Sequence, residues 1–157
     1  MSEMTILGID PGTRCGWGLL IGDRRIASGA WDLASRRHEG GGMRYLRARR
    51  YLLEICDSYK VDAVAYEEVR RHRSTDAAHV YGGIVGIITA TCEEKQIPFR
   101  AIPVGTVKKH ATGKGNASKE MMRDAAEQRW DFELTSGDDE ADALFIALAL
   151  SDDLHSS

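Results

Sequence analysis

The sequence has few cysteines and prolines, and it has no long hydrophobic run. Its three cysteines are odd in number and never spaced as C-x-x-C, which argues against a disulfide framework and a cysteine zinc site. We expect three packed, reduced thiols. The longest nearly apolar stretches, residues 82–92 and 143–150, are shorter than the roughly 20 residues of a membrane-spanning helix. The first four residues, MSEM, also lack the basic start of a signal peptide, so we expect a cytoplasmic protein without a membrane span.

Low-complexity sequence is absent as well. Three prolines and sixteen scattered glycines form no repetitive tract, and 43% hydrophobic with 29% charged residues is ordinary for a globular protein. A chain of 157 residues has the usual size of one domain. We therefore expect a single domain over residues 1–157, with residues 152–157 as a disordered tail.

The formal net charge is only −3, but the charges are unevenly distributed. Eight carboxylates and no Lys or Arg follow residue 130, which leaves a surplus of five positive charges in the first 129 residues. The basic residues cluster at 44–50, 70–73 and 108–119. A basic surface beside an acidic spot suits a phosphate-binding protein with a metal site. A solvated surface with uneven charge is the alternative.

The hydrophobic pattern predicts an α/β domain with a mixed sheet. An antiparallel meander opens the chain, and strands then alternate with amphipathic helices. Predicted strands cover Thr5–Asp10 and residues 16–21, 25–33, 61–66 and 98–103. Predicted helices cover Met43–Tyr59, Thr75–Lys95 and residues 106–111, and two more begin near Ser118 and Asp138.

Carboxylates interrupt this pattern in three places. Asp10 closes the first strand, Glu67 and Glu68 follow the fourth, and Asp139 and Asp142 share one face near the start of the last helix. Such a cluster without a matching buried base requires cations, and all-oxygen ligands favour Mg²⁺ or Mn²⁺ over zinc.

Each of these features also has a simpler interpretation. The segment Asp10-Pro11-Gly12-Thr13 could be only a turn, and residues 138–142 could be only an acidic helix start with Asp138 as its N-cap. Strand alternation places Glu67 and Glu68 on opposite faces without saying which face bears the chemistry.

Four motifs in order resemble the RuvC family of Holliday-junction resolvases. They are ILGIDPGT at residues 6–13, AYEEV at 65–69, the basic segment VKKHATGKGNASK at 107–119 and DEADAL at 139–144. The resemblance extends over about residues 5–150. It implies an RNase H-like fold, with a mixed five-stranded sheet flanked by helices, and a homodimer that nicks two opposed strands of a four-way junction. The expected products carry a 5′ phosphate and a 3′ hydroxyl.

The resemblance also assigns the site residues. It implies four metal ligands, Asp10, Glu67, Asp139 and Asp142, and so selects Glu67 over Glu68. Two Mg²⁺ ions, replaceable by Mn²⁺, would bind there, and Lys119 would act near the scissile phosphate. The implied DNA-binding residues are Arg70, Arg71, Arg73, Lys108, Lys109, Lys114 and Lys119. Arg70 stands where family members often have an aromatic wedge, so either stacking on a base or a phosphate contact is open to it.

Partners and alternatives remain. The chain is somewhat shorter than typical cellular members and resembles compact phage or prophage variants, so a partnership with a RuvA and RuvB branch-migration machine stays open. A related nuclease could accept flaps, forks or RNA/DNA hybrids. Two other classes are an actin-like ATPase or sugar kinase, suggested by the Asp10-Pro11-Gly12-Thr13 turn, and a catalytically silent DNA-binding module.

Overall fold

The computed structural model describes residues 3–156 and has one mixed five-stranded sheet in the order β3-β2-β1-β4-β5. β1 pairs antiparallel with β2 and parallel with β4, and β4 pairs parallel with β5. The α/β expectation is confirmed. The strands are β1 (Thr5–Asp10), β2 (Arg14–Ile21), β3 (Arg24–Asp32), β4 (Ala63–Glu68) and β5 (Phe99–Pro103). The helices are α1 (Met43–Tyr59), α2 (Thr75–Lys95), α3 (Val104–Thr112), α4 (Lys119–Trp130) and α5 (Gly137–His155).

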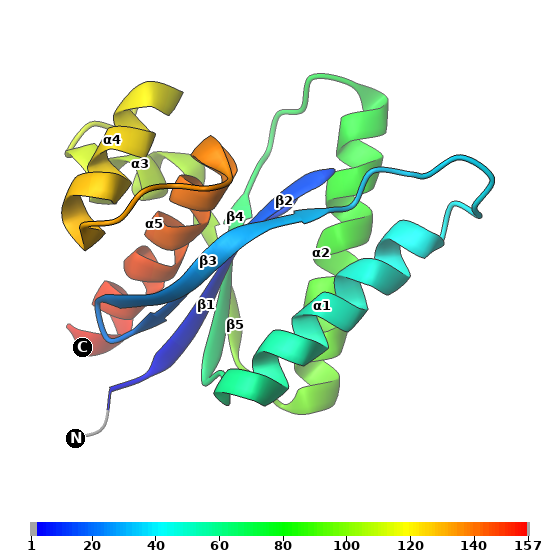
Figure 1. The fold of residues 1–157 in the computed structure, drawn as a ribbon, viewed down its shortest axis with the longest axis horizontal. Helices are drawn as coiled ribbons and strands as arrows, with labels where there is room; N and C mark the ends of the chain where they lie inside the picture. Colours follow the sequence, from blue (N-terminus) through cyan, green and yellow to red (C-terminus); the bar gives the residue numbers. More distant parts are fainter. Residues whose placement is uncertain (1–2, 157) are drawn as a thin grey trace.

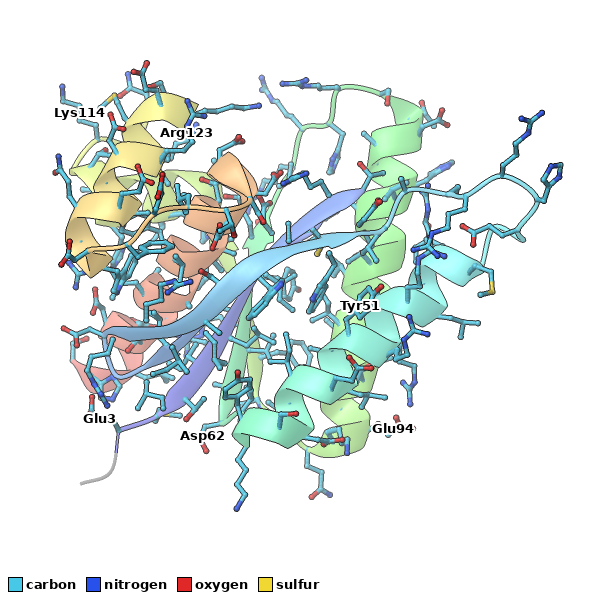
Figure 2. All side chains as sticks on the ribbon, viewed as in Figure 1. Glu3, Tyr51, Asp62, Glu94, Lys114 and Arg123 are labelled. Carbon is cyan, nitrogen blue, oxygen red and sulfur yellow. The ribbon has the colours of Figure 1, made fainter. Side chains whose placement is uncertain are left out.

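The sheet separates two helical layers (Figure 1). One face packs against α5, which is in turn covered by α3 and α4, while α1 and α2 cover the other face. Side chains fill both interlayer spaces (Figure 2). Because α5 lies between the sheet and two helices, its residues 143–150 are buried on all sides, and not on the single apolar face that its sequence predicts.

Glycines let α5 approach the sheet closely. A Cβ atom on Gly8 would lie 2.2 Å from the Ala143 carbonyl oxygen, and one on Gly16 would lie 1.9 Å from the Asp139 carbonyl oxygen. Gly18 makes a similar contact with Leu144. Since any side chain here would push the helix outward, these glycines set the distance between α5 and the strands β1 and β2.

Some boundaries differ from the prediction. β4 continues through Glu68, because its edge is paired with β5 up to Pro103. Ser136, and not Asp138, is the N-cap residue of α5, so Asp138 lies inside the first turn. Residues 152–155, expected in a disordered tail, form the end of α5, with Asp153 paired to Arg100 on β5; the last residue of that tail, 157, lies outside the described residues.

Two further expectations concern side chains. The three cysteines are free and buried, as predicted. Leu46 is 60% exposed, although an apolar residue of an amphipathic helix is expected on the buried side, which in α1 is formed by Ala48, Leu52 and Cys56 together with Arg47. Arg47 is accommodated because it donates hydrogen bonds to Glu39 and to the Ala34 carbonyl oxygen. Among residues 3–156, no helix is both long and apolar enough to cross a membrane.

Candidate active site

Asp10 and Glu67 lie side by side at the ends of two parallel strands. The strand register pairs Ile9 of β1 with Tyr66 of β4, and each carboxylate is the next residue on its strand. Strand alternation puts Glu67 on the face of Ala63 and Ala65, whose side chains pack in the α5 core. Val64 belongs to the opposite core, so Glu68 is on the α1 and α2 side. The structure thus shows that Glu67 is on the α5 side of the sheet and Glu68 on the opposite side.

The first turns of α5 bring two more carboxylates to the same place. Asp139 and Asp142 lie three residues apart on one face of the helix, and both are half-buried. The glycine contacts of Gly8 and Gly16 press this end of α5 against β1 and β2. Four carboxylates from three elements therefore gather at one edge of the sheet.

The pKa values report this crowding. Burial raises the pKa of Asp10 well above its ordinary value, and the charges of Glu67, Asp142 and Asp139 raise it further. Burial raises the pKa of Asp142 to about 8, with added repulsion from Glu67, and raises that of Glu67 to about 7. Burial also raises the pKa of Asp139, and the nearby charges of Arg14 and Lys119 partly offset this rise.

This charge arrangement fits divalent cations. Buried carboxylates that repel one another need a compensating positive charge, and an all-oxygen set is the preferred environment of Mg²⁺ or Mn²⁺. Within residues 3–156, no three His, Cys, Asp or Glu side chains already surround a point where a metal ion would sit. The carboxylates thus have the charge and the ligand type that a metal site requires.

Basic side chains surround the carboxylates. The Arg14 Nε lies 3.4 Å from the Asp139 Oδ2, and the Lys119 Nζ lies 3.9 Å from the Asp138 Oδ2. Lys108 is close enough to oppose the rise in the pKa values of Glu67 and Asp142. Arg14 was missed by the sequence analysis, because its proximity to Asp139 depends on the packing of β2 against α5.

The other basic residues spread outward from this edge. Arg70, Arg71 and Arg73 are exposed on the segment between β4 and α2, and the Arg70 Nε donates to the Glu68 Oε1 at 2.7 Å. Lys109 and Lys114 are exposed at the end of α3 and just after it. Among the predicted DNA-binding residues, Lys108 and Lys119 are therefore the two whose positive charges lower the pKa values of these carboxylates.

A buried glutamate that the sequence analysis passed over fixes the start of α5. Glu140 is fully buried, and its Oε1 accepts hydrogen bonds from the backbone amides of Thr135 and Ser136, at 2.9 Å each. Its Oε2 accepts from the Ser28 hydroxyl of β3, and the Arg25 guanidinium lies 3.9 Å away. Because Glu140 follows Asp139 directly, this network holds the helix end that bears two site carboxylates.

Comparisons with known proteins agree with this geometry. The family model for the crossover junction endodeoxyribonuclease RuvC matches residues 6–150. RuvC of Ehrlichia chaffeensis is 28% identical over 147 residues, covering 92% of this chain and 94% of that relative, and RuvC of Ruegeria pomeroyi is 30% identical with 92% and 89% covered. The first of these shows that the chain's length is not peculiar to phage variants.

Solved structures point the same way. Thermus thermophilus RuvC in complex with a Holliday junction substrate superposes with a TM-score of 0.82 at 27% identity, over 93% of this chain and 92% of that one. A Fowlpox virus resolvase bound to Holliday junction DNA shares the fold at a TM-score of 0.59 and 14% identity. The RNase H-like fold is therefore confirmed.

Proposed function

The chain belongs to the RuvC family of crossover junction endodeoxyribonucleases, and from this premise we propose that it resolves four-way DNA junctions by paired nicks. It is a hydrolytic, metal-dependent nuclease by family. The observation that supports the proposal most directly is the set of four carboxylates from β1, β4 and α5, with raised pKa values and a basic rim. A nuclease acting on cellular DNA would work in the cytoplasm.

We assign the metal ligands to Asp10, Glu67, Asp139 and Asp142. Two Mg²⁺ ions, or Mn²⁺ in their place, would supply an activated water and stabilise the leaving 3′ oxygen. The carboxylates would hold the cations, and the positive charge of the cations would balance the negative charge of the carboxylates. With the water as nucleophile, no side chain needs to form a covalent bond, and hydrolysis leaves a 5′ phosphate and a 3′ hydroxyl.

Lysines on α3 and α4 complete the proposed site. Lys119 lies in the first turn of α4, beside Asp138, where its positive charge would face the scissile phosphate. Lys108 approaches the carboxylates from α3. Arg70, Arg71 and Arg73 on one side and Lys109 and Lys114 on the other would hold DNA backbones on either side of the cleaved bond.

We propose a symmetric dimer that presents two such sites to opposed strands. The outward face of α2 suits this role, because Gly82, Gly86 and Ala90 are exposed at helical spacing and no neighbouring atom covers Gly82 or Gly86. Small residues allow two helices to approach closely. The inward face of the same helix buries Ile84 and Ile88 in the domain core.

The proposal is tested by cleavage of a mobile four-way junction with Mg²⁺, compared with linear duplex, flap, fork and RNA/DNA hybrid substrates. Symmetric nicks in opposed strands of the junction, with ends that a ligase seals, are expected, together with weak cutting of the other substrates. Equal cutting of flaps or hybrids would favour the relaxed nuclease instead.

A further inference from the structure

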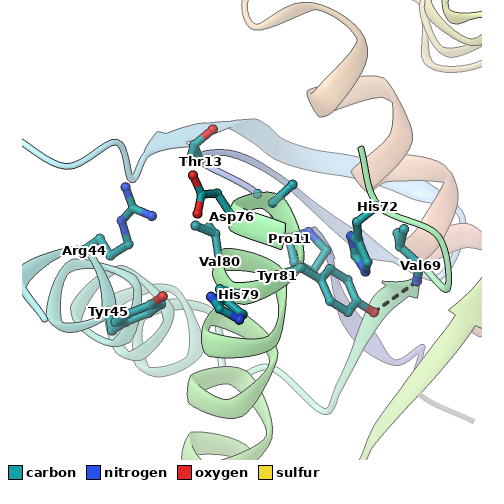
Figure 3. A pocket seen from close by; sticks show the side chains of 12 residues that line it. Pro11, Thr13, Arg44, Tyr45, Val69, His72, Asp76, His79, Val80 and Tyr81 are labelled. Atoms are coloured by element: carbon teal, nitrogen blue, oxygen red, sulfur yellow. Dashed lines mark hydrogen bonds between the residues drawn. The ribbon is translucent and has the colours of Figure 1, made fainter. Parts of the chain in front are cut away.

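A cavity lies on the α1 and α2 side of the sheet (Figure 3). It has a volume of about 680 Å³ and is lined by Tyr45 of α1, by Asp76 and Tyr81 of α2, and by the turn that begins at Pro11. Pro11 directly follows Asp10, and Val69, another lining residue, comes two residues after Glu67. The cavity lining therefore includes one residue that directly follows Asp10 and another that closely follows Glu67 in the chain.

Four rings and two charged groups line this cavity. The rings belong to Tyr45, His72, His79 and Tyr81, and the charges to Arg44 and Asp76. Aromatic faces stack on nucleobases of any sequence, and charged side chains hydrogen-bond to base edges or phosphate. A cavity of this size is within the range that accepts small planar ligands. Its chemistry matches a single nucleobase with its sugar.

Three of the rings are held in place before any ligand arrives. The Tyr81 hydroxyl donates to the Glu67 carbonyl oxygen at 2.8 Å and accepts from the Val69 amide at 3.1 Å. The His72 ring leans on the Tyr81 ring with a centroid distance of 4.9 Å. The Tyr45 ring fills the space over Gly83, where a Cβ atom would lie only 2.4 Å from it. Fixed walls reduce the ordering cost of binding.

We propose that this cavity receives an unpaired nucleobase from the crossover of the junction, next to the cleaved bond. The inference rests on the proposed function, because only a branched substrate offers a base that is already free. Bases in a continuous duplex are paired and stacked, and extracting one from it is costly. A base bound in the cavity thus favours the junction over linear DNA. The phosphate next to that base then lies at the ends of β1 and β4, near Asp10 and Glu67.

The test fills the cavity and leaves the carboxylates untouched. Ala77 is exposed and lines the cavity, so Ala77→Trp adds a ring there without replacing packed atoms. Gln128→Trp, exposed on α4 and outside the lining, is the matched control. Binding is measured without divalent ions on a four-way junction that has 2-aminopurine at one crossover position, and in parallel on a junction that is abasic at that position.

Wild-type protein and Gln128→Trp are expected to quench the 2-aminopurine and to bind the intact junction about tenfold more tightly than the abasic one. Ala77→Trp is expected to lose both the quenching and the preference. His79→Ala, which removes one ring, is a second variant with an expected smaller loss of about threefold.

Wild-type behaviour of both Ala77→Trp and His79→Ala would overturn the inference, and so would equal binding of intact and abasic junctions by wild-type protein. A changed sedimentation coefficient of Ala77→Trp would also overturn it, because it would assign the cavity to a contact between two copies of the chain. Quenching by a protein that fails to cleave the junction would refute the proposed function and still support the cavity as a base site.

Discussion

At the residue scale, Asp10, Glu67, Asp139 and Asp142 hold protons more strongly in the folded protein than in the unfolded chain. The pKa of Asp142 rises from 3.8 to about 8, and that of Asp10 is also raised. For such groups the stabilising contribution is complete below about pH 4 and is lost as the pH rises through about 8. Bound cations would reverse the loss, because they stabilise the ionised form.

Metal and pH are therefore expected to act together on thermal stability. At ten times its dissociation constant, Mg²⁺ should raise the Tm by roughly 3 to 6 °C at pH 8 and by less at pH 6. Thermal unfolding of metal-free and Mg²⁺-loaded protein at both pH values measures this. Asp142→Asn should weaken the Mg²⁺ effect. A metal-free protein that becomes more stable between pH 6 and pH 8 would contradict the account of the site.

Lys119 distinguishes chemistry from binding. If its charge faces the scissile phosphate, Lys119→Ala should slow cleavage by about 100-fold even when all the junction is bound. Single-turnover rates at saturating protein measure this, with Lys114→Ala as an exposed control that should mainly weaken affinity and its salt dependence. Full recovery of the Lys119→Ala rate at high protein concentration would show that Lys119 only contacts the DNA backbone and does not act in the chemical step.

At the element scale, the glycines under α5 determine where its carboxylates lie. Gly8→Ala would place a methyl group 2.2 Å from the Ala143 carbonyl oxygen and should cost about 1 to 3 kcal/mol of unfolding free energy, with a loss of cleavage. Gly105→Ala, in the first turn of α3, meets nothing within 4 Å and should be neutral or stabilising by up to about 1 kcal/mol. Urea unfolding compares the two variants, and an unchanged Gly8→Ala would disprove the close contact.

The elements also show what the sequence could predict. Amphipathic spacing and start signals predicted α1 and α2 to the residue, because caps and periodicity are local. The all-round burial of α5 and the fixation of Glu140 depend on residues more than 100 positions away, such as Ser28 and Gly8, and no local pattern contains them. The same holds for Arg14, whose role near Asp139 appears only when β2 lies beside α5.

The four site carboxylates were predictable for a different reason. Asp10 and Glu67 lie at or next to the ends of buried strands, and Asp139 and Asp142 lie in the first turns of a buried helix, so each breaks an apolar pattern that would otherwise continue. The choice of Glu67 over Glu68 needed either the family resemblance or the side on which Ala63 and Ala65 pack. Strand periodicity alone places Glu67 and Glu68 on opposite faces of the sheet and does not tell which face bears the site.

At the scale of the whole molecule, the dimer is the untested requirement of paired nicking. Sedimentation equilibrium should give about 35 kDa, twice the 17.3 kDa chain mass. Gly86→Arg would place a charged side chain on the open face of α2 and should yield a monomer, whereas Gly105→Ala should remain dimeric. A wild-type monomer at micromolar concentration with junction present would rule out coordinated nicking by this face.

The central claim, that Asp10, Glu67, Asp139 and Asp142 form the metal-dependent centre that cuts a four-way junction, is tested most directly by one pair of variants. Glu67 and Glu68 are adjacent, but they lie on opposite faces of the sheet. In Mg²⁺ at saturating protein, Glu67→Gln should abolish junction cleavage while binding is kept or tightened, and Glu68→Gln should cleave at close to the wild-type rate. Equal loss in both variants, or wild-type cleavage by Glu67→Gln, would contradict the account.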